Sequence, residues 1–235
     1  GRSDIVAQGK VKDFLPFYFH DSTISGNLSL QSNFLDLDEL MGPEEPEDTS
    51  VVEEDYEIVE VPDNIKFVLG TNFKELIYDS MSLTYMLGKV VVNNSVVDMT
   101  NLSFNMMKGS IVLNGSYSTQ TPSVPRVNFS MNISQWDLPT TFETFNTVQK
   151  MAPIAESATG RFSTSLEFAC ELDSIMMPIY QSINGGGQLK THKVVVDGSG
   201  SLEKAAEVLK NDDFARMELN DVNITYEFVD GRVHI

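Results

Sequence analysis

The sequence predicts a mainly β (α+β) fold, a curved antiparallel sheet that forms an apolar groove and is partly covered by two or three short helices. Three observations support this prediction. Apolar and polar residues alternate along most of the 235-residue chain, as in strands with one apolar and one polar face. Apolar residues at helical spacing occur only in short segments. The apolar strand faces are also too large for those helices to cover.

The clearest strand is the segment RVNFSMNIS, residues 126–134, in which Val127, Phe129, Met131 and Ile133 alternate with Asn and Ser. The same alternation predicts roughly ten strands. Tight turns are expected at Lys108–Gly109 and at the "DG" of residues 230–231. The other predicted apolar faces carry Ile24, Leu28, Leu30 and Phe34; Ile65, Phe67, Leu69 and Phe73; Met81, Leu83, Tyr85 and Leu87; Leu102, Phe104 and Met106; Ile111, Leu113 and Tyr117; Phe162, Leu166, Phe168, Cys170 and Leu172; and Ile224, Tyr226 and Phe228.

Three segments favour helices. Residues 139–153 space Phe142, Phe145, Val148 and Met151 at helical intervals, with Thr140 or Thr141 as N-cap and Pro153 as the end. Residues 174–183, SIMMPIYQSI, are a weaker candidate that ends at "NGGG". Residues 201–211 carry an apolar stripe at i, i+3, i+4 and i+7.

The apolar faces exceed what these helices can cover. Eight strands, each ~25 Å long and spaced ~4.8 Å apart, offer roughly 950 Å² per face. A ten-residue helix covers roughly 150 Å². Three such helices leave about half of one face uncovered. Sheet curvature, a second sheet or a foreign apolar molecule must cover the remainder, and the sequence leaves these alternatives open.

The net charge of −18 argues against nucleic acid as a partner. Most of this charge lies in residues 36–64, which hold 13 Asp or Glu and no Lys or Arg. We expect residues 41–64 to form an acidic flexible loop, since such charge density is costly to bury. The single cysteine, Cys170, excludes an internal disulfide framework and is expected in the core. The abrupt start and end suggest a single module, residues 1–235, cut from a longer protein.

The sequence offers little for catalysis. His20, His192 and His234 are not spaced for a nucleophile site with Cys170 or a serine. No Gly-x-Ser-x-Gly, HExxH or CxxC occurs, and the glycine-rich segments lack the residues of a dinucleotide or phosphate loop. We therefore expect a protein that is not an enzyme, with no catalytic residue, metal site or cofactor.

From about residue 85 onward, the order of features resembles the C-terminal region of AsmA-like proteins of Gram-negative envelopes. The segments that carry the resemblance are VVDMTNLSFNMMKGSIVLNGSY (96–117), the series from VPRVNFSMNISQWDLP through APIA and GRFSTSLEF to INGGGQLKTHKVVVDG (124–198), and LNDVNITYEFVDGRVHI (219–235). The earlier segments GKVKDFLPFY and SGNLSLQSNFLDLDELM fit more loosely. The acidic insert departs from the family pattern.

The resemblance implies a periplasmic protein of the cell envelope, held in the inner membrane by an anchor absent from this chain. AsmA-like proteins are similar to TamB and to the chorein-type bridge proteins, whose curved sheets carry lipid acyl chains toward the outer membrane. The implied role is phospholipid transfer in outer membrane biogenesis. The implied partners are a phospholipid or other acyl-chain ligand and other envelope proteins.

On this interpretation the groove is lined by thirteen apolar residues, which we call the groove candidates. An alternative remains open, namely a structural or adhesion-type β domain whose apolar faces close on each other in a sealed core. The groove candidates are Leu102, Phe104, Met106, Val127, Phe129, Met131, Ile133, Phe162, Leu166, Phe168, Ile224, Tyr226 and Phe228.

Overall fold

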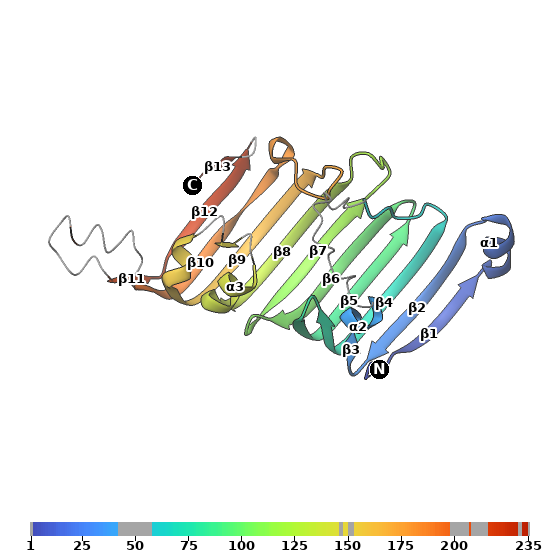
Figure 1. The fold of residues 1–235 in the computed structure, drawn as a ribbon, viewed down its shortest axis with the longest axis horizontal. Helices are drawn as coiled ribbons and strands as arrows, with labels where there is room; N and C mark the ends of the chain where they lie inside the picture. Colours follow the sequence, from blue (N-terminus) through green and yellow to red (C-terminus); the bar gives the residue numbers. More distant parts are fainter. Residues whose placement is uncertain are drawn as a thin grey trace, which may run out of the picture.

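The protein is one long, curved β-sheet. The computed structural model describes residues 2–41, 58–145, 148–149, 153–197, 207, 216–229 and 232–234. These residues form a 13-stranded sheet with the order β1-β2-β4-β5-β6-β7-β8-β9-β10-β12-β13, in which β3 pairs with β4 and β11 with β10 (Figure 1). The strands are β1 (Val6–Lys12), β2 (Ile24–Ser32), β3 (Leu35–Asp36), β4 (Ile65–Tyr78), β5 (Met81–Asn93), β6 (Val96–Met106), β7 (Gly109–Ser118), β8 (Arg126–Asp137), β9 (Ala158–Glu171), β10 (Asn184–Asp197), β11 (Arg216–Asn220), β12 (Asn223–Val229) and β13 (Arg232–His234).

The sheet is mixed, although an antiparallel sheet was predicted. Strand β2 pairs in parallel with β4, with Leu28 opposite Leu69, and β3 also pairs in parallel with β4. The parallel register is possible because β3, α2 (Leu37–Met41) and the acidic segment intervene between β2 and β4 and allow the chain to cross back. The other strand pairs in the described part of the chain are antiparallel.

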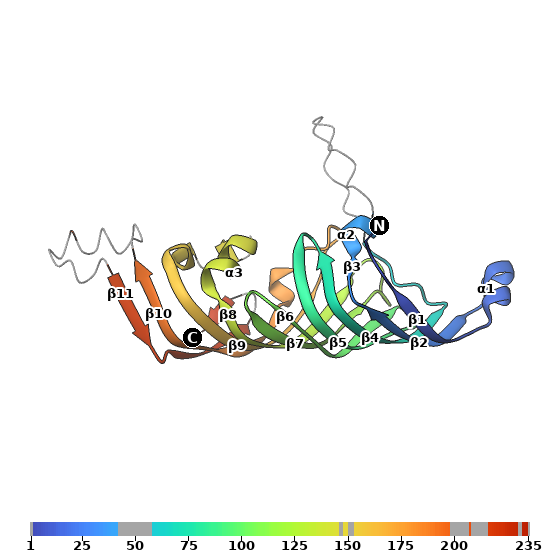
Figure 2. The ribbon, with the colours of Figure 1, turned by 90° about the horizontal axis from the view of Figure 1, so that it is seen from below.

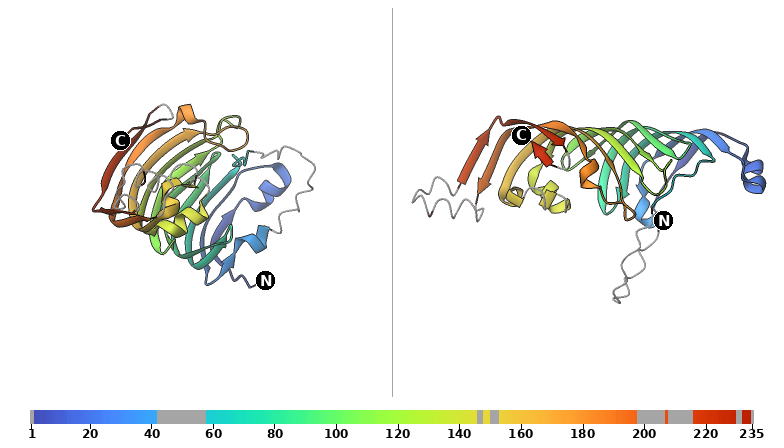
Figure 3. Two further views of the ribbon diagram at one scale, coloured as in Figure 1. Left: turned by 60° about the vertical axis from the view of Figure 1, so that its left-hand side comes forward. Right: turned by 90° about the horizontal axis from the view of Figure 1, so that it is seen from above.

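The sheet curves into a trough, with α2 and α3 on its concave side (Figures 2 and 3). The register shifts by one residue at three points along β5, β6 and β8. At these points Tyr85, Asn101 and Gln135 adopt positive φ angles of 55°, 49° and 56°. The N–H groups of Asn101 and Gln135 are satisfied by side chains of the neighbouring strands, Asn114 Oδ1 at 2.8 Å and Ser163 Oγ at 3.0 Å. These are β-bulges, which bend strands and increase their twist.

The bulge in β5 corrects one predicted strand face. Alternation placed Met81, Leu83, Tyr85 and Leu87 together, but Leu83 is buried while Tyr85 and Leu87 are 68% and 50% exposed. One extra residue in a strand inverts the alternation that follows it. The turn after β6 is also one residue earlier than predicted, at Met107–Lys108, and Gly109 begins β7. The predicted hairpin near residue 230 is supported by the pairing of Val229 with Arg232.

The predicted number of short helices is confirmed, with α1 (Phe14–His20), α2 (Leu37–Met41) and α3 among the described residues, but their positions differ from those predicted. The segment 139–153 gives α3 (Leu138–Thr144), which begins one residue before that segment and ends well before Pro153. Its N-cap is Asp137, whose carboxylate accepts hydrogen bonds from Thr140 N and Thr140 Oγ1. Pro153 starts the 3₁₀ turn η1 (Pro153–Ser157). The segment 174–183 forms only the 3₁₀ turn η2 (Tyr180–Ser182), and its "NGGG" lies in β10.

Two predicted segments lie largely outside the described residues. The predicted helix 201–211 lies outside the described residues except for Glu207. In the acidic segment 41–64, residues 42–57 lie outside them. Val61, near the end of that segment, is buried, and its N–H donates to Thr119 Oγ1 at 2.9 Å. Part of the segment therefore packs against the end of β7.

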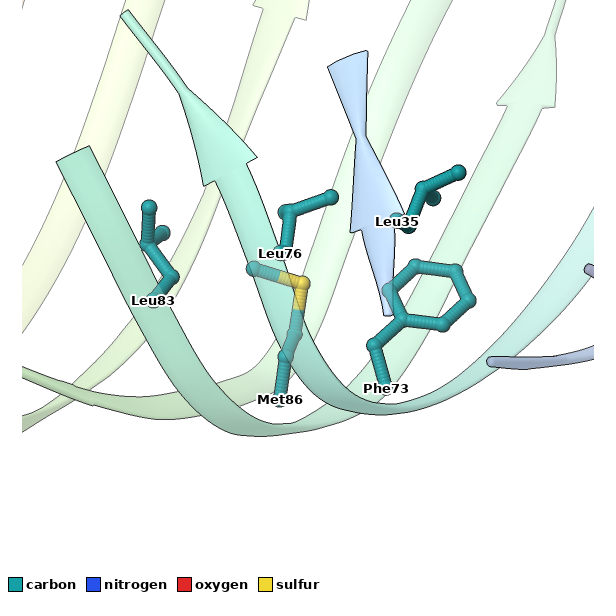
Figure 4. Close-up of a cluster of buried hydrophobic side chains, with 5 residues drawn as sticks. All are labelled: Leu35, Phe73, Leu76, Leu83 and Met86. Atoms are coloured by element: carbon teal, nitrogen blue, oxygen red, sulfur yellow. The ribbon is translucent and has the colours of Figure 1, made fainter. Parts of the chain in front are cut away.

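Buried side chains gather in three clusters on the concave side. The largest consists of Phe73, Leu76, Leu83 and Met86 in the bend of β4 and β5, together with Leu35 of the neighbouring strand β3 (Figure 4). A second consists of Ala158, Val194 and Val196, with Leu138 of α3 packed against it. The third consists of Cys170, Leu172 and Ile183, where the connection after β9 folds back. The predicted burial of Cys170 is confirmed, and burial raises the pKa of its thiol.

Candidate functional site: the concave apolar face

The groove candidates all lie on one face of the sheet, because cross-strand partners share a face. The register joins them into rows that run across the strands. We call Leu102, Leu113, Met131, Leu166, Gly187 and Tyr226 the central row. One flanking row consists of Phe104, Ile111, Ile133, Thr164, Leu189 and Ile224, and the other of Leu28, Leu69, Val90, Met99, Gly115, Phe129, Phe168, Gly185 and Phe228. Val127, Met106 and Phe162 lie beyond these rows, opposite Cys170, Gly109 and Thr191.

The rows contain no Asp, Glu, Lys, Arg or His. The longest row spans nine strands, or about 38 Å at the usual strand spacing of ~4.8 Å. One lipid leaflet contributes ~15 Å of hydrocarbon thickness, half of the ~30 Å core of a bilayer. The face is therefore long enough to contact more than one acyl chain along its length.

The groove candidates are neither buried nor fully exposed; all thirteen are half-buried. The buried clusters lie beside β3, α3 and the connection after β9. In the region between the buried clusters, Met131 lies beside its cross-strand neighbours Leu113 and Leu166 and is partly solvent-exposed. The prediction of a partly covered apolar face is confirmed.

Glycines keep the concave face shallow. The Phe67 ring lies within 2.7 Å of where a Cβ on Gly26 would stand, and Phe129 lies within 2.4 Å of the same point on Gly115. Tyr226 likewise lies over Gly187, and its hydroxyl reaches Thr164 Oγ1 two strands away, at 3.1 Å. Any side chain at these glycines would lift the neighbouring ring. The rings lie along the sheet and form a smooth apolar floor.

A shallow hollow of about 520 Å³ adjoins the central row. Most of its lining belongs to the opposite, polar face, which contributes residues such as Ser130, Glu167 and Gln188, and the central row contributes Met131, Leu166 and Tyr226. It surrounds Gly185–Gly187, where β10 carries no side chains.

Helix α3 covers only one rim of the face. Phe145, just after the helix, stacks on Trp136 with ring centroids 6.0 Å apart, and Phe162 meets Trp136 edge-on at 6.4 Å. Trp136 Nε1 and Thr191 Oγ1 are buried and have no hydrogen-bond partner among the described residues. Because Trp136, Phe162 and Thr191 are successive cross-strand partners, both polar atoms lie at this covered rim.

At the rim away from α3, a hydrogen bond joins the sheet to the acidic segment. The Tyr117 hydroxyl donates to the carbonyl of Val59 at 2.8 Å, and burial together with the nearby Glu60 raises the pKa of Tyr117. The acidic segment therefore ends against the wall of the concave face.

Several residues of the face were not among the groove candidates. Val90, Val92, Val97 and Met99 continue the rows into β5 and β6, and Leu189 continues them into β10. The run VVVNNSVVDM that contains the first four is apolar at consecutive positions, so alternation does not distinguish its two faces. Recognising the two-residue "NS" turn within it would have set the register.

No protein-family model, curated protein or solved structure matches this chain significantly. The AsmA-like resemblance therefore stays a prediction based on the ordered segments. Among the described residues, no helix is long and apolar enough to cross a membrane. The same part of the chain brings no three His, Cys, Asp or Glu side chains together as a metal site.

Proposed function

We propose that this chain is a non-enzymatic lipid-carrying module of the Gram-negative cell envelope. In this role the concave face shields acyl chains from water while phospholipid moves between membranes. The observation that carries the proposal is the set of uncharged rows, of which the longest is about 38 Å long, and whose middle residues are only half-buried. An apolar surface of this size rarely stays in contact with water on a soluble protein.

The energetics favour acyl chains as the occupant. Each buried methylene contributes about 0.8 kcal/mol, and the contact is non-directional. Rings lying over Gly115 and Gly187 leave no projecting side chain to stop a chain from sliding.

The AsmA-like resemblance supports a periplasmic location, with an inner-membrane anchor supplied by the longer protein. In that setting the module would serve outer membrane biogenesis together with other envelope proteins. A structural or adhesion-type domain with a closed core is the second candidate, favoured by the three buried clusters at the rims.

Native mass spectrometry tests the proposal. The protein is purified from a bacterial membrane extract in mild detergent, and the detergent is removed by collision in the gas phase. We expect adducts with the mass of phospholipids. A chain that carries no lipid, and that also fails to take up a fluorescent phospholipid from micelles, would refute the proposal and favour the closed-core domain.

A further inference from the structure

The helix α1 (Phe14–His20, FLPFYFH) exposes most of its large side chains. Phe14, Leu15, Tyr18 and Phe19 are 59%, 63%, 73% and 67% exposed. No residue of the helix is buried. A short helix is marginal in water without tertiary packing of its apolar side. The apolar residues of α1 therefore lack the contact that such a helix normally needs.

This exposure is local. Of the 17 large apolar residues that are exposed among the described residues, seven lie between residues 5 and 19. An aromatic side chain hides ~150–250 Å² when fully buried, so the exposed parts of the four helix side chains amount to roughly 400 Å². That is about the size of the largest apolar patch on a typical soluble monomer, where such patches mark binding sites.

The helix lies at one end of the trough. It connects β1 with β2 at the edge of the sheet and projects beyond the strands (Figures 1 and 2). The rows of the concave face run along the long axis and reach this edge, where Gly9 and Val11 of β1 pair with Leu28 and Gly26. Val11 is itself 47% exposed.

The surroundings of α1 suit a lipid surface better than the rest of the chain does. Within residues 2–24, the three basic residues Arg2, Lys10 and Lys12 balance the three carboxylates Asp4, Asp13 and Asp21, whereas the whole chain carries −18. Lys10 and Lys12 are exposed on the strand that leads into the helix. Phe and Tyr side chains next to lysines are typical of segments that lie in the headgroup region of a bilayer.

We propose that α1 is an interfacial anchor that docks this end of the trough on a phospholipid bilayer. Phe14, Leu15, Tyr18 and Phe19 enter the headgroup region, and Phe17 is the one half-buried residue of the helix. The purpose of the docking rests on the proposed lipid transfer, because it would bring the end of the apolar rows to the membrane. The docking itself requires only the exposed helix.

Vesicle flotation tests the docking. The whole chain, freed of detergent, is mixed with vesicles of phosphatidylethanolamine and phosphatidylglycerol. The test variant is the triple substitution Phe14→Gln, Tyr18→Gln and Phe19→Gln, all at exposed positions, so the circular dichroism spectrum and melting temperature should not change. A matched control replaces two exposed tyrosines elsewhere, Tyr85→Gln and Tyr180→Gln, which are 68% and 65% exposed.

We expect the wild type and the control to float with the vesicles, and the triple variant to bind at least about tenfold more weakly. A wild type that stays in solution, or a triple variant that floats as well as the wild type, would overturn the proposal. A wild type that does not bind vesicles but dimerises through α1 would also overturn the proposal, since a second copy of the chain would then be the partner.

The docking and the lipid-carrying function fail separately. Met131→Asp should still float with vesicles while losing co-purified lipid. The triple variant should still take up a fluorescent phospholipid from micelles while failing to float. A wild type that floats but carries no lipid would refute only the lipid-carrying function, and a wild type that carries lipid but does not float would refute only the docking.

Discussion

Replacing Met131 by aspartate tests whether the middle of the concave face is open. Met131 is half-buried in the central row, between Leu113 and Leu166. In an open face the new carboxylate stays hydrated, and the variant loses only the partial burial of the methionine, about 1–2 kcal/mol. The protein should fold, and the charge should prevent acyl chains from lying on the row.

The magnitude differs sharply at a covered position. Met86 is 7% exposed within the cluster of Leu35, Phe73, Leu76 and Leu83. Met86→Asp buries an unpaired charge, which costs several kcal/mol or more, a large share of the ~5–15 kcal/mol that holds a domain together. This variant should unfold or lose most of its stability. The same residue types thus compare a sealed site with an open one.

The assays are chemical denaturation for stability and native mass spectrometry for bound phospholipid. Asn132→Asp, the next residue of β8 on the opposite face, controls for charge alone and should retain both stability and lipid. If Met131→Asp destabilises the protein as much as Met86→Asp does, the central row lies in a sealed core and the reasoning fails. A folded Met131→Asp variant that keeps its lipid would refute the groove instead.

Three further predictions concern the rims and the termini. Asp137→Ala removes the N-cap of α3 and its 3.0 Å ion pair with the exposed Lys108, and should lower stability by about 1–2 kcal/mol in urea denaturation without unfolding the sheet; an unchanged midpoint would show that the cap contributes nothing. Hydrogen bonds from Phe34 N, Asn33 and Ser32 hold the pKa of Asp4 well below its ordinary value of 3.8. The contribution of ionised Asp4 to folding stability is therefore full above pH 3.8 and should be lost as the pH falls further, which amide exchange at Phe34 would report as reduced protection. Protection at Phe34 that does not change with acid would contradict this. Replacing residues 42–57 with a short Gly-Ser linker should leave the melting temperature within a few degrees, because their charge density opposes burial; loss of folding would reveal a structural role.

Alternation within the chain was sufficient to predict the two faces of most strands. Side-chain direction in a strand depends only on position along the chain, so Val127, Phe129, Met131 and Ile133 had to share a face wherever β8 was placed. The thirteen groove candidates reach one concave face for this local reason. The mainly β class and the partial cover follow from the same count of apolar strand positions against helical ones.

The failures of the sequence prediction have identifiable causes. Alternation predicts Tyr85 on the same face as Leu83, but the bulge at Tyr85 inverts the alternation. No local sequence signal indicates that this tyrosine adopts a positive φ angle. Helix α3 ends at Thr144 because Phe145 adopts an extended backbone, which spacing alone does not mark, and the Phe145 ring stacks on Trp136. The parallel pairing of β2 with β4 depends on how a long connection crosses the sheet, which strand patterns do not encode.

The division between open and covered surface is likewise a property of the folded molecule. Met86 and Met131 are the same residue type at apolar strand positions, yet Met86 is buried in the cluster with Leu35 and Phe73 while Met131 is half-buried in the middle of the face. The alternating sequence pattern places both methionine side chains on the apolar face of their strands. Which of them is sealed depends on where β3, α3 and the connection after β9 come to rest. Those positions result from long-range packing between segments far apart in the chain, which no local pattern specifies.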